Sequence, residues 1–139
     1  MTGAPALPFA TVHRLRFNDT DQLGHVNNAV FAVMLEQGRT ELAASCGLPF
    51  GSEEHSLVIV RLELDFVREM TWPGDVRIET AVARIGTRSF TLRQRLLHGG
   101  ELCARAETVL VIMDRAAKKA TALTAEQRAA LEPWLAVDG

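Results

Sequence analysis

The sequence has few of the residues that cross-link, coordinate or anchor a protein. Its 139 residues include only two cysteines and no tyrosine. Cys46 and Cys103 have no spacing typical of a metal or redox site, so we expect two reduced thiols and no metal. No apolar run approaches the ~18 residues that a membrane span needs. The composition therefore argues against a disulfide scaffold, and we expect no membrane partner.

Positively and negatively charged residues nearly balance. The formal net charge is −2 and no block of like charge occurs, whereas nonspecific nucleic-acid binding needs a basic surface. The first ten residues lack the charged start and long apolar core of a signal peptide. We therefore expect a cytoplasmic protein that does not bind nucleic acid. Its residues 1–139 should form a single domain, with residues 1–10 as a loose arm.

The order of the hydrophobic residues predicts one long helix, 28–45, among strands. Four residues spaced three and four apart share one face of this helix: Phe31, Leu35, Gly38 and Leu42. Gly38 costs about 1 kcal/mol relative to alanine in a helix, so we expect another segment to pack closely against it. Alternating apolar residues predict five strands, at 11–17, 57–67, 76–82, 90–97 and 102–113.

Short connections between the later strands predict the topology. Gly99 and Gly100 suit a two-residue hairpin turn. We expect the last four strands to form an antiparallel meander. A single long helix must bury its apolar face on that sheet, so the sheet should curl around the helix in an α+β fold. Thr124 and Gln127 suit the capping box of a short C-terminal helix, 125–131.

The stretch NDTDQLGHVNNAVF, residues 18–31, gathers polar side chains just before the long helix. The first N–H groups of a helix have no intrahelical partner and carry partial positive charge. Such groups can stabilise an oxyanion that forms on a carbonyl. A carboxylate beside them, such as Asp21, can act as a base toward water or attack the carbonyl itself. This combination would suit hydrolysis of an activated acyl group.

The same residues also have structural interpretations. Asparagine is common at helix starts, and Asn27 could serve only as an N-cap. Asp19 suits an Asx turn, and His25 suits a structural role. Glu36 and Arg39 have the spacing of an ion pair on a helix surface. The residues alone leave both kinds of interpretation open.

Two longer stretches resemble a known family. DTDQLGHVNNAVFAVMLEQGRTEL resembles the signature of the hot-dog-fold acyl-CoA thioesterases in the 4-hydroxybenzoyl-CoA thioesterase superfamily. LDFVREMTWPGDVRIETAVARIGTRSFTLRQRL is similar to the strand, Gly-Asp turn, strand and G-x-x-S-F segment of that family. The resemblance covers residues 14–113. It implies a hot-dog fold, in which one long helix is wrapped by a curved antiparallel sheet of about five strands.

The resemblance implies roles for individual residues. Asp21 matches the catalytic aspartate of the family, and Asn28 matches the helix-entry residue whose backbone N–H polarises the thioester carbonyl. His25 matches a catalytic histidine of the related plant acyl-carrier-protein thioesterases, although Leu23 replaces the asparagine that accompanies it there. Phe31 stands where many relatives have a tyrosine, so the pocket has no phenol hydroxyl.

Further residues are expected around the substrate. His25 and Asn27 would order the loop or contact the substrate, and Glu36 would hold the loop from the helix. Arg88 and Ser89 match positions that often contact the CoA phosphates or pantetheine in the family. Family members form dimers or tetramers with acyl-CoA bound near a subunit boundary. We therefore expect a homodimer or homotetramer with acyl-CoA as its substrate.

The predicted activity is hydrolysis of an acyl-CoA thioester to a free acid and CoA, without a cofactor. Asp21 would act as general base or nucleophile, with a backbone N–H at the helix start as the oxyanion donor. Two alternatives remain. One is a non-catalytic acyl-CoA-binding or scaffold protein with a hot-dog fold. The other is a hot-dog enoyl thioester hydratase or dehydratase, which usually holds a histidine and an acid over the substrate.

Overall fold

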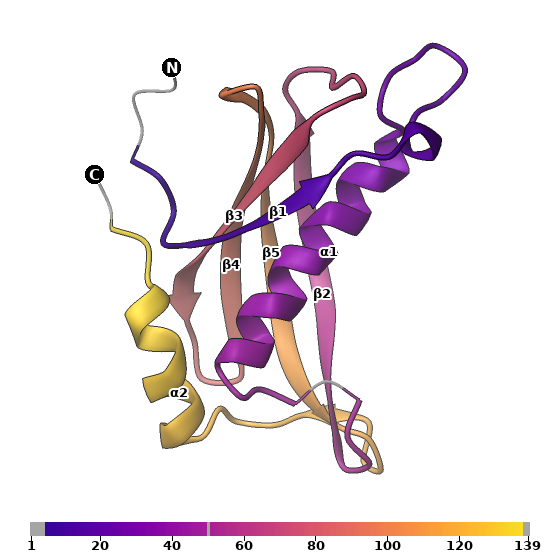
Figure 1. The fold of residues 1–139 in the computed structure, drawn as a ribbon. Helices are drawn as coiled ribbons and strands as arrows, with labels where there is room; N and C mark the ends of the chain where they lie inside the picture. The colour runs from indigo at the N-terminus through magenta and orange to yellow at the C-terminus, as the bar shows by residue number, and fades with distance from the viewer. Residues whose placement is uncertain (1–4, 50, 138–139) are drawn as a thin grey trace.

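The computed structural model describes residues 5–49 and 51–137. A long helix, α1 (Asn28–Ser45), lies against a sheet of long strands, and a shorter helix, α2 (Ala125–Leu131), lies near the C-terminal end of α1 (Figure 1). The strands are β1 (Phe9–Arg14), β2 (His55–Phe66), β3 (Asp75–Ile85), β4 (Ser89–His98), β5 (Glu101–Asp114) and the short β6 (Lys119–Ala120). Two 3-10 turns are η1 (Phe17–Asp19) and η2 (Glu132–Trp134).

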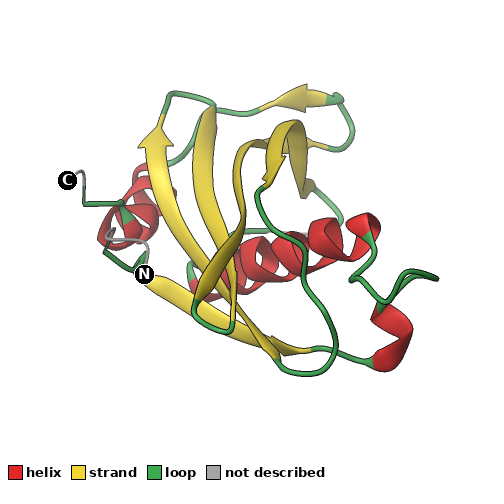
Figure 2. Cartoon of the chain, turned by 90° about the horizontal axis from the view of Figure 1, so that it is seen from above, coloured by secondary structure: helices red, strands yellow, loops and turns green. Residues whose placement is uncertain are grey.

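The predicted α+β architecture is confirmed. α1 has the predicted bounds, 28–45. Thr124 and Gln127 form the predicted capping box of α2, in which Gln127 N–H donates to Thr124 Oγ1 at 3.0 Å. Seen from above, the strands curve around α1 (Figure 2). This curvature lets several strands contact the apolar face of one helix.

The first strand lies earlier than predicted. β1 begins at Phe9 and ends at Arg14, whereas the pattern predicted 11–17. Leu15 instead leaves the strand and is buried in the core, and its N–H donates to Gly74 O at 2.9 Å. The apolar residues after position 14 therefore belong to the turn that leads into η1, and the strand does not continue through them.

The loose arm expected over residues 1–10 is wrong for the part that the structure describes. Phe9 and the residue after it belong to β1, which pairs with β3. Leu7 N–H donates to Glu79 Oε1 at 3.2 Å, because a buried carboxylate on β3 offers a strong acceptor there. The start of the expected arm, residues 1–4, lies outside the described residues.

The strand order is β1-β3-β4-β5-β2, and all neighbouring strands are antiparallel. β3, β4 and β5 form the predicted meander. The expectation that β2 belongs to it is wrong, because β2 pairs with β5 from His55↔Asp114 to Phe66↔Ala104. The connection over residues 67–74 is long enough to cross the end of the sheet. β2 thereby becomes an edge strand, and its last residues reach the start of α1.

The predicted close approach at Gly38 is confirmed. A Cβ atom built on Gly38 would lie 2.6 Å from Ile78 Cγ2 and 2.8 Å from Gln94 Nε2. Gln94 is fully buried and donates to Leu35 O at 2.9 Å and to Thr80 Oγ1 at 3.0 Å. The middle of α1 therefore rests directly on β3 and β4.

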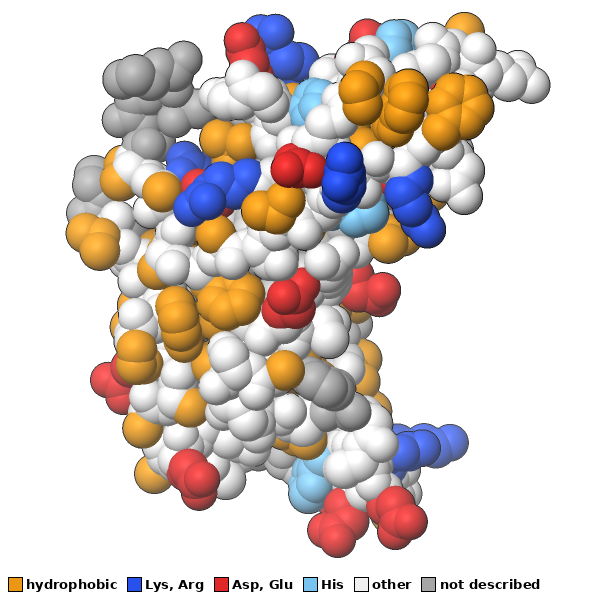
Figure 3. All heavy atoms as spheres, in the orientation of Figure 1, with side chains coloured by type: hydrophobic (Ala, Val, Ile, Leu, Met, Phe, Trp, Pro, Cys, Tyr) orange, Lys and Arg blue, Asp and Glu red, His pale blue; other side chains and the backbone are white. Residues whose placement is uncertain are grey.

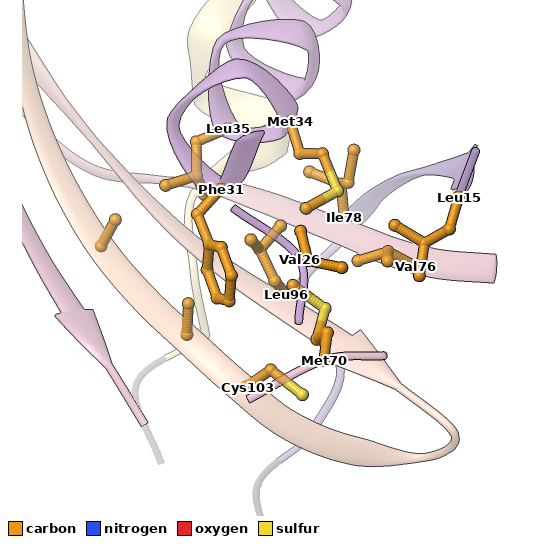
Figure 4. Packing of buried hydrophobic residues seen from close by; sticks show 12 residues of the cluster. Leu15, Val26, Phe31, Met34, Leu35, Met70, Val76, Ile78, Leu96 and Cys103 are labelled. Atoms are coloured by element: carbon orange, nitrogen blue, oxygen red, sulfur yellow. The ribbon is translucent and has the colours of Figure 1, made fainter. Parts of the chain in front are cut away.

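The first turns of α1 pack on a hydrophobic cluster. Phe31 and Met34 point from α1 toward the sheet, with Val26, Met70 and Leu96 around them (Figure 4). All five are buried. Burying a side chain of this size stabilises a protein by about 1.5–3 kcal/mol. The cluster therefore holds the N-terminal end of α1, and the loop that leads into it, firmly against the sheet.

Candidate active site

The polar loop before α1 closes on itself through backbone hydrogen bonds. Asp21 N–H donates to His25 O at 2.8 Å, and Thr20 and Val26 form an isolated antiparallel bridge. Gly24 has a φ of 82°, a conformation that glycine adopts without steric cost. The chain therefore makes a narrow excursion, and Asp21 and His25 face each other near its base.

Asp19 lies at the neck of this loop and is 3% exposed. Its Oδ2 accepts hydrogen bonds from Arg16 N–H at 2.8 Å and from His13 Nε2 at 3.0 Å. Its backbone oxygen accepts one from Asn27 N–H at 2.9 Å. Burial opposes ionisation of Asp19, but the hydrogen bonds from the backbone N–H of Arg16 and the side chain of His13, with the charges of these two residues, outweigh burial and lower its pKa. Asp19 is a buried anchor and not the expected Asx turn.

The N-cap of α1 is Asn27, whose Oδ1 accepts from Ala29 N–H at 2.9 Å. Its backbone oxygen accepts from Val30 N–H at 2.9 Å. Within the described chain, no acceptor is found for the N–H of Asn28. This group belongs to the first helical residue, so it carries partial positive charge. It is therefore available to an anion or to a polarised carbonyl.

A pocket of about 230 Å³ lies between this loop, α1 and the end of β2. The residues that line it are Asp21, His25, Val26, Asn28, Phe31, Phe66, Val67, Arg68 and Glu69. Four of the predicted site residues therefore meet at one pocket: Asp21, His25, Asn28 and Phe31.

The carboxylate of Asp21 is only partly engaged. Asp21 is exposed, and its Oδ1 accepts from Leu23 N–H at 2.9 Å and from His25 N–H at 3.3 Å. Among residues 5–49 and 51–137, no donor to Oδ2 is found. The hydrogen bond from Leu23 N–H is that of an Asx turn, which orients the Asp21 side chain. Oδ2 thus remains available to accept a proton from water or to attack a carbonyl.

His25 contacts the segment that follows β2. Its Nε2 lies 3.1 Å from Glu69 Oε2, and its backbone forms an isolated bridge with Thr71. The side chains are 34% exposed for His25 and 72% exposed for Glu69, so solvent weakens the pair. Both His25 and Glu69 line the pocket.

Aromatic rings form an apolar wall of the pocket. The rings of Phe31 and Phe66 lie 5.1 Å apart at an interplanar angle of 62°. Phe31 is buried, whereas Phe66 is 52% exposed. The wall would suit an apolar acyl group, because such a group gains by leaving water.

Sequence reasoning missed the pocket residues at and after the end of β2: Phe66, Val67, Arg68 and Glu69. The pattern showed them only as the end of a strand and a turn. They reach the pocket because β2 pairs with β5 instead of β3, which the meander expectation did not include. A sequence signal that β2 is an edge strand would have indicated that its end lies at the pocket.

Glu36 does not line this pocket. It lines a separate groove of about 100 Å³ with Arg39, Leu57 and Ile59 among others. The expected surface ion pair is wrong for Arg39, which is 6% exposed and donates from Nη1 to Gln94 Oε1 at 3.4 Å. Burial lowers the pKa of Arg39, while the charge of Glu36 acts in the opposite direction.

Arg88 lies in the turn between β3 and β4, and Ser89 is the first residue of β4. In Figure 1 this turn lies near the C-terminal end of α1, whereas the loop that contains Asp21 precedes the N-terminal end. The turn lies beside α2: Arg128 Nη1 donates to Gly86 O at 2.6 Å, and Leu123 N–H donates to Thr87 O at 2.9 Å. A helix as long as α1 spans about 27 Å. In one chain, Arg88 and Ser89 therefore do not share a pocket with Asp21. Asn27 also lies outside the lining of the pocket.

Apolar surface surrounds the exposed end of the loop. Phe17 is 74% exposed, Leu23 is 78% exposed and Trp72 is 47% exposed. The rings of Phe17 and Trp72 lie 5.7 Å apart, nearly perpendicular. Figure 3 shows hydrophobic side chains gathered at this end of the molecule, at the upper right. The surface beside the pocket is therefore suited to apolar contacts.

The part of the chain that the structure describes contains no group of three or more His, Cys, Asp and Glu side chains that could hold a metal ion. No helix in residues 5–49 and 51–137 is both long and apolar enough to cross a membrane. The pocket instead offers a carboxylate oxygen, a helix N-terminal N–H and an aromatic wall. These groups can activate water, stabilise an oxyanion and bind an acyl group.

Comparisons with known proteins agree with the geometry. A predicted thioesterase from Bacillus stearothermophilus is 30% identical, with a TM-score of 0.86 over 94% of this chain and 98% of that chain. A thioesterase from Thermus thermophilus, solved in complex with coenzyme A and Zn, is 27% identical, with a TM-score of 0.81 over 90% of this chain and 98% of that chain. The uncharacterised protein YsmA of Bacillus subtilis is 25% identical over 84% of this chain and 80% of its own length.

These structures confirm the hot-dog fold that the resemblance implied. Residues 15–134 match the family model of the thioesterase-like superfamily. The match includes the loop with Asp21, all of α1 and the strands β2 to β6, and it begins just after β1. The chain therefore belongs to the thioesterase-like superfamily.

Proposed function

We propose that this protein is an acyl-CoA thioesterase, a single domain that hydrolyses an acyl-CoA thioester to a free acid and CoA. The observation that carries the proposal is the meeting of Asp21 and Asn28 at one pocket. Among the described residues, Asp21 Oδ2 has no donor and Asn28 N–H has no acceptor. A free carboxylate oxygen and a free helix N–H are the two groups that acyl transfer to water requires. Family membership supports the same reaction class.

In the proposed reaction, the thioester carbonyl lies in the pocket between Asp21 and the start of α1. Asp21 Oδ2 removes a proton from a water molecule, which attacks the carbonyl carbon, or Asp21 attacks directly and forms a mixed anhydride that water then hydrolyses. The negative charge that develops on the carbonyl oxygen is stabilised by the N–H of Asn28. The C–S bond then breaks, and the CoA thiolate leaves and takes up a proton.

We assign supporting roles to the residues around Asp21. His25 orders the loop through its contact with Glu69 and touches the substrate. Phe31 contributes the apolar wall for the acyl group. Asn27 acts through its N-cap hydrogen bonds. Glu36 acts from outside the pocket, through its charge toward the buried Arg39.

CoA is the proposed carrier of the acyl group, because the Thermus relative is described as a complex with coenzyme A. The exposed Arg68 lies in the lining of the pocket and could contact a phosphate, although it also pairs with Glu101 at 3.1 Å. Cys46 and Cys103 are free thiols, which agrees with a reducing compartment. We therefore propose the cytoplasm as the site of action.

A homo-oligomer is part of the proposal, and β2 is the proposed contact. β2 is a long edge strand, and an uncovered edge invites pairing with another strand. It exposes Val60 and Leu62, which are 58% and 39% exposed. Arg61 and Glu63 flank Leu62, so antiparallel pairing of two β2 strands about Leu62 would set opposite charges face to face.

This assembly would also give Arg88 and Ser89 a role. They do not line the pocket that contains Asp21, so we propose that they bind the CoA of a partner subunit. The charge of an arginine suits the CoA phosphates. A homodimer is the smallest assembly with this arrangement, and a homotetramer would contain two.

Release of free thiol from a panel of acyl-CoAs with short, long and aromatic acyl groups tests the proposed activity. We expect thiol release for at least one member. Acyl-CoA binding without thiol release would instead support the binding or scaffold protein. Loss or gain of enoyl thioester absorbance without free thiol would support a hydratase or dehydratase. Either of these outcomes would reject hydrolysis.

A further inference from the structure

A hydrogen bond joins β1 to the neck of the active-site loop. His13 Nε2 lies 3.0 Å from Asp19 Oδ2, and the two side chains are 17% and 5% exposed. A carboxylate can only accept, so His13 donates through Nε2. The backbone of His13 is paired with Val76 in the sheet. The donor is therefore carried by a rigid strand, and its acceptor belongs to the loop.

Asp19 connects His13 both to the start of α1 and to the loop that carries Asp21. Its backbone oxygen accepts from Asn27 N–H at 2.9 Å, and Asn27 caps the helix whose first free N–H belongs to Asn28. On its other side, Asp19 is followed by Thr20, which bridges to Val26 and closes the loop that carries Asp21. Asp21 and Asn28 thus depend on the same neck.

We infer that His13 and Asp19 are positioning residues, which set the distance and direction between the Asp21 carboxylate and the N–H of Asn28. This inference rests on the proposed function. His13 and Asp19 are absent from the lining of the pocket described above, so they act through the loop and not on the substrate. A catalytic group misplaced by about 1 Å can lose up to about a hundredfold in rate. Substrate binding, which depends on the pocket wall, should change little.

The test compares His13→Leu with His13→Gln. Leucine removes the donor, whereas the amide of glutamine reaches about as far as Nε2 and can donate to Asp19. For His13→Leu we expect kcat to fall about tenfold or more with KM nearly unchanged, and for His13→Gln we expect kcat near that of the natural protein. Amide exchange at Asn27 should become faster in His13→Leu and return toward its original rate in His13→Gln. His55→Gln, at the far end of β2, is the matched control.

The outcomes separate this inference from the proposed function. If the natural protein releases no thiol, the proposed function fails. If it does release thiol and His13→Leu keeps both its kcat and its slow exchange at Asn27, only the positioning role fails. Equal losses in His13→Leu and His13→Gln would also overturn it, because the hydrogen bond would then not be responsible. If His13→Leu does not fold, His13→Asn, whose amide is too short to reach Asp19, takes its place with the same expectations.

Discussion

In the interface between α1 and the sheet, the side chain of Gln94 fills the space beside Gly38 that a Cβ atom would need. The Nε2 atom of Gln94 lies 2.8 Å from the position that a Cβ on Gly38 would occupy. That amide cannot move away freely, because it donates to Leu35 O and Thr80 Oγ1 in a fully buried position. The absence of a side chain at position 38 thus allows α1 to contact a buried polar group and an isoleucine at once.

Gly38→Ala should therefore destabilise the protein, although alanine is the better helix former. We expect a loss of about 1–3 kcal/mol in the free energy of unfolding, as for other overpacked interiors. Urea denaturation measures this loss. Thr40→Ala, on an exposed position of the same helix, should change the free energy by no more than about 0.5 kcal/mol. An unchanged or increased stability of Gly38→Ala would contradict the packing described.

Acid should destabilise the fold through Glu79 and Asp19. Burial opposes ionisation of Glu79, but hydrogen bonds from Arg77, Arg95 and Leu7 N–H outweigh burial and lower its pKa below the ordinary 4.5. The pKa of Asp19 is likewise lowered below 3.8. Both carboxylates therefore stabilise the folded state fully above these ordinary values, and this contribution is lost as the pH falls through the lower folded-state values.

The free energy of unfolding should accordingly decrease as the pH is lowered from about 5 toward 2. Chemical denaturation at several pH values measures this dependence. Glu79→Gln should be less stable at pH 7 and should lose less stability on acidification, because the titrating group has gone. The same dependence on pH in Glu79→Gln and in the natural protein would show that Glu79 does not contribute.

The proposed contact through β2 predicts a change in assembly for Leu62→Arg. Two arginines would meet at the centre of the paired strands, where like charges are destabilising. We expect the oligomer to dissociate at concentrations at which the natural protein remains assembled, as measured by light scattering after size-exclusion chromatography. Val12→Arg, at an exposed position of β1 on the other edge of the sheet, is the control. Dissociation by Val12→Arg alone would place the contact at β1.

The positions of the helices and strands were predicted from the sequence better than the pairing of the strands was. The three- and four-residue spacing from Phe31 to Leu42 located α1, and the same pattern required the close approach at Gly38. The position of β2 was wrong, because alternation shows that a strand exists but not which neighbour it selects. The pocket residues after β2, such as Glu69, were missed for the same reason.

The candidate site was predictable where the chemistry is local. Asp21, His25 and Asn28 lie within one loop and one helix start, so their meeting follows from short-range geometry. Asp19 was misjudged because its partner His13 is on another strand, and only the fold shows that the carboxyl is buried. The separation of Arg88 from Asp21 depends on the length of α1 and the direction of the strands.

Thiol release by Asp21→Asn tests the central claim most directly. Asparagine keeps the size of the side chain and an oxygen for Leu23 N–H, but it can neither remove a proton nor attack a carbonyl as a carboxylate does. Asp65→Asn, on an exposed position of β2, controls for the loss of one negative charge. The measurement is kcat/KM on the best acyl-CoA of the panel, with folding checked by circular dichroism. We expect Asp21→Asn to fold normally and to lose at least about a hundredfold in kcat/KM, while Asp65→Asn remains active. Hydrolysis by folded Asp21→Asn at close to the natural rate would contradict the assignment of Asp21.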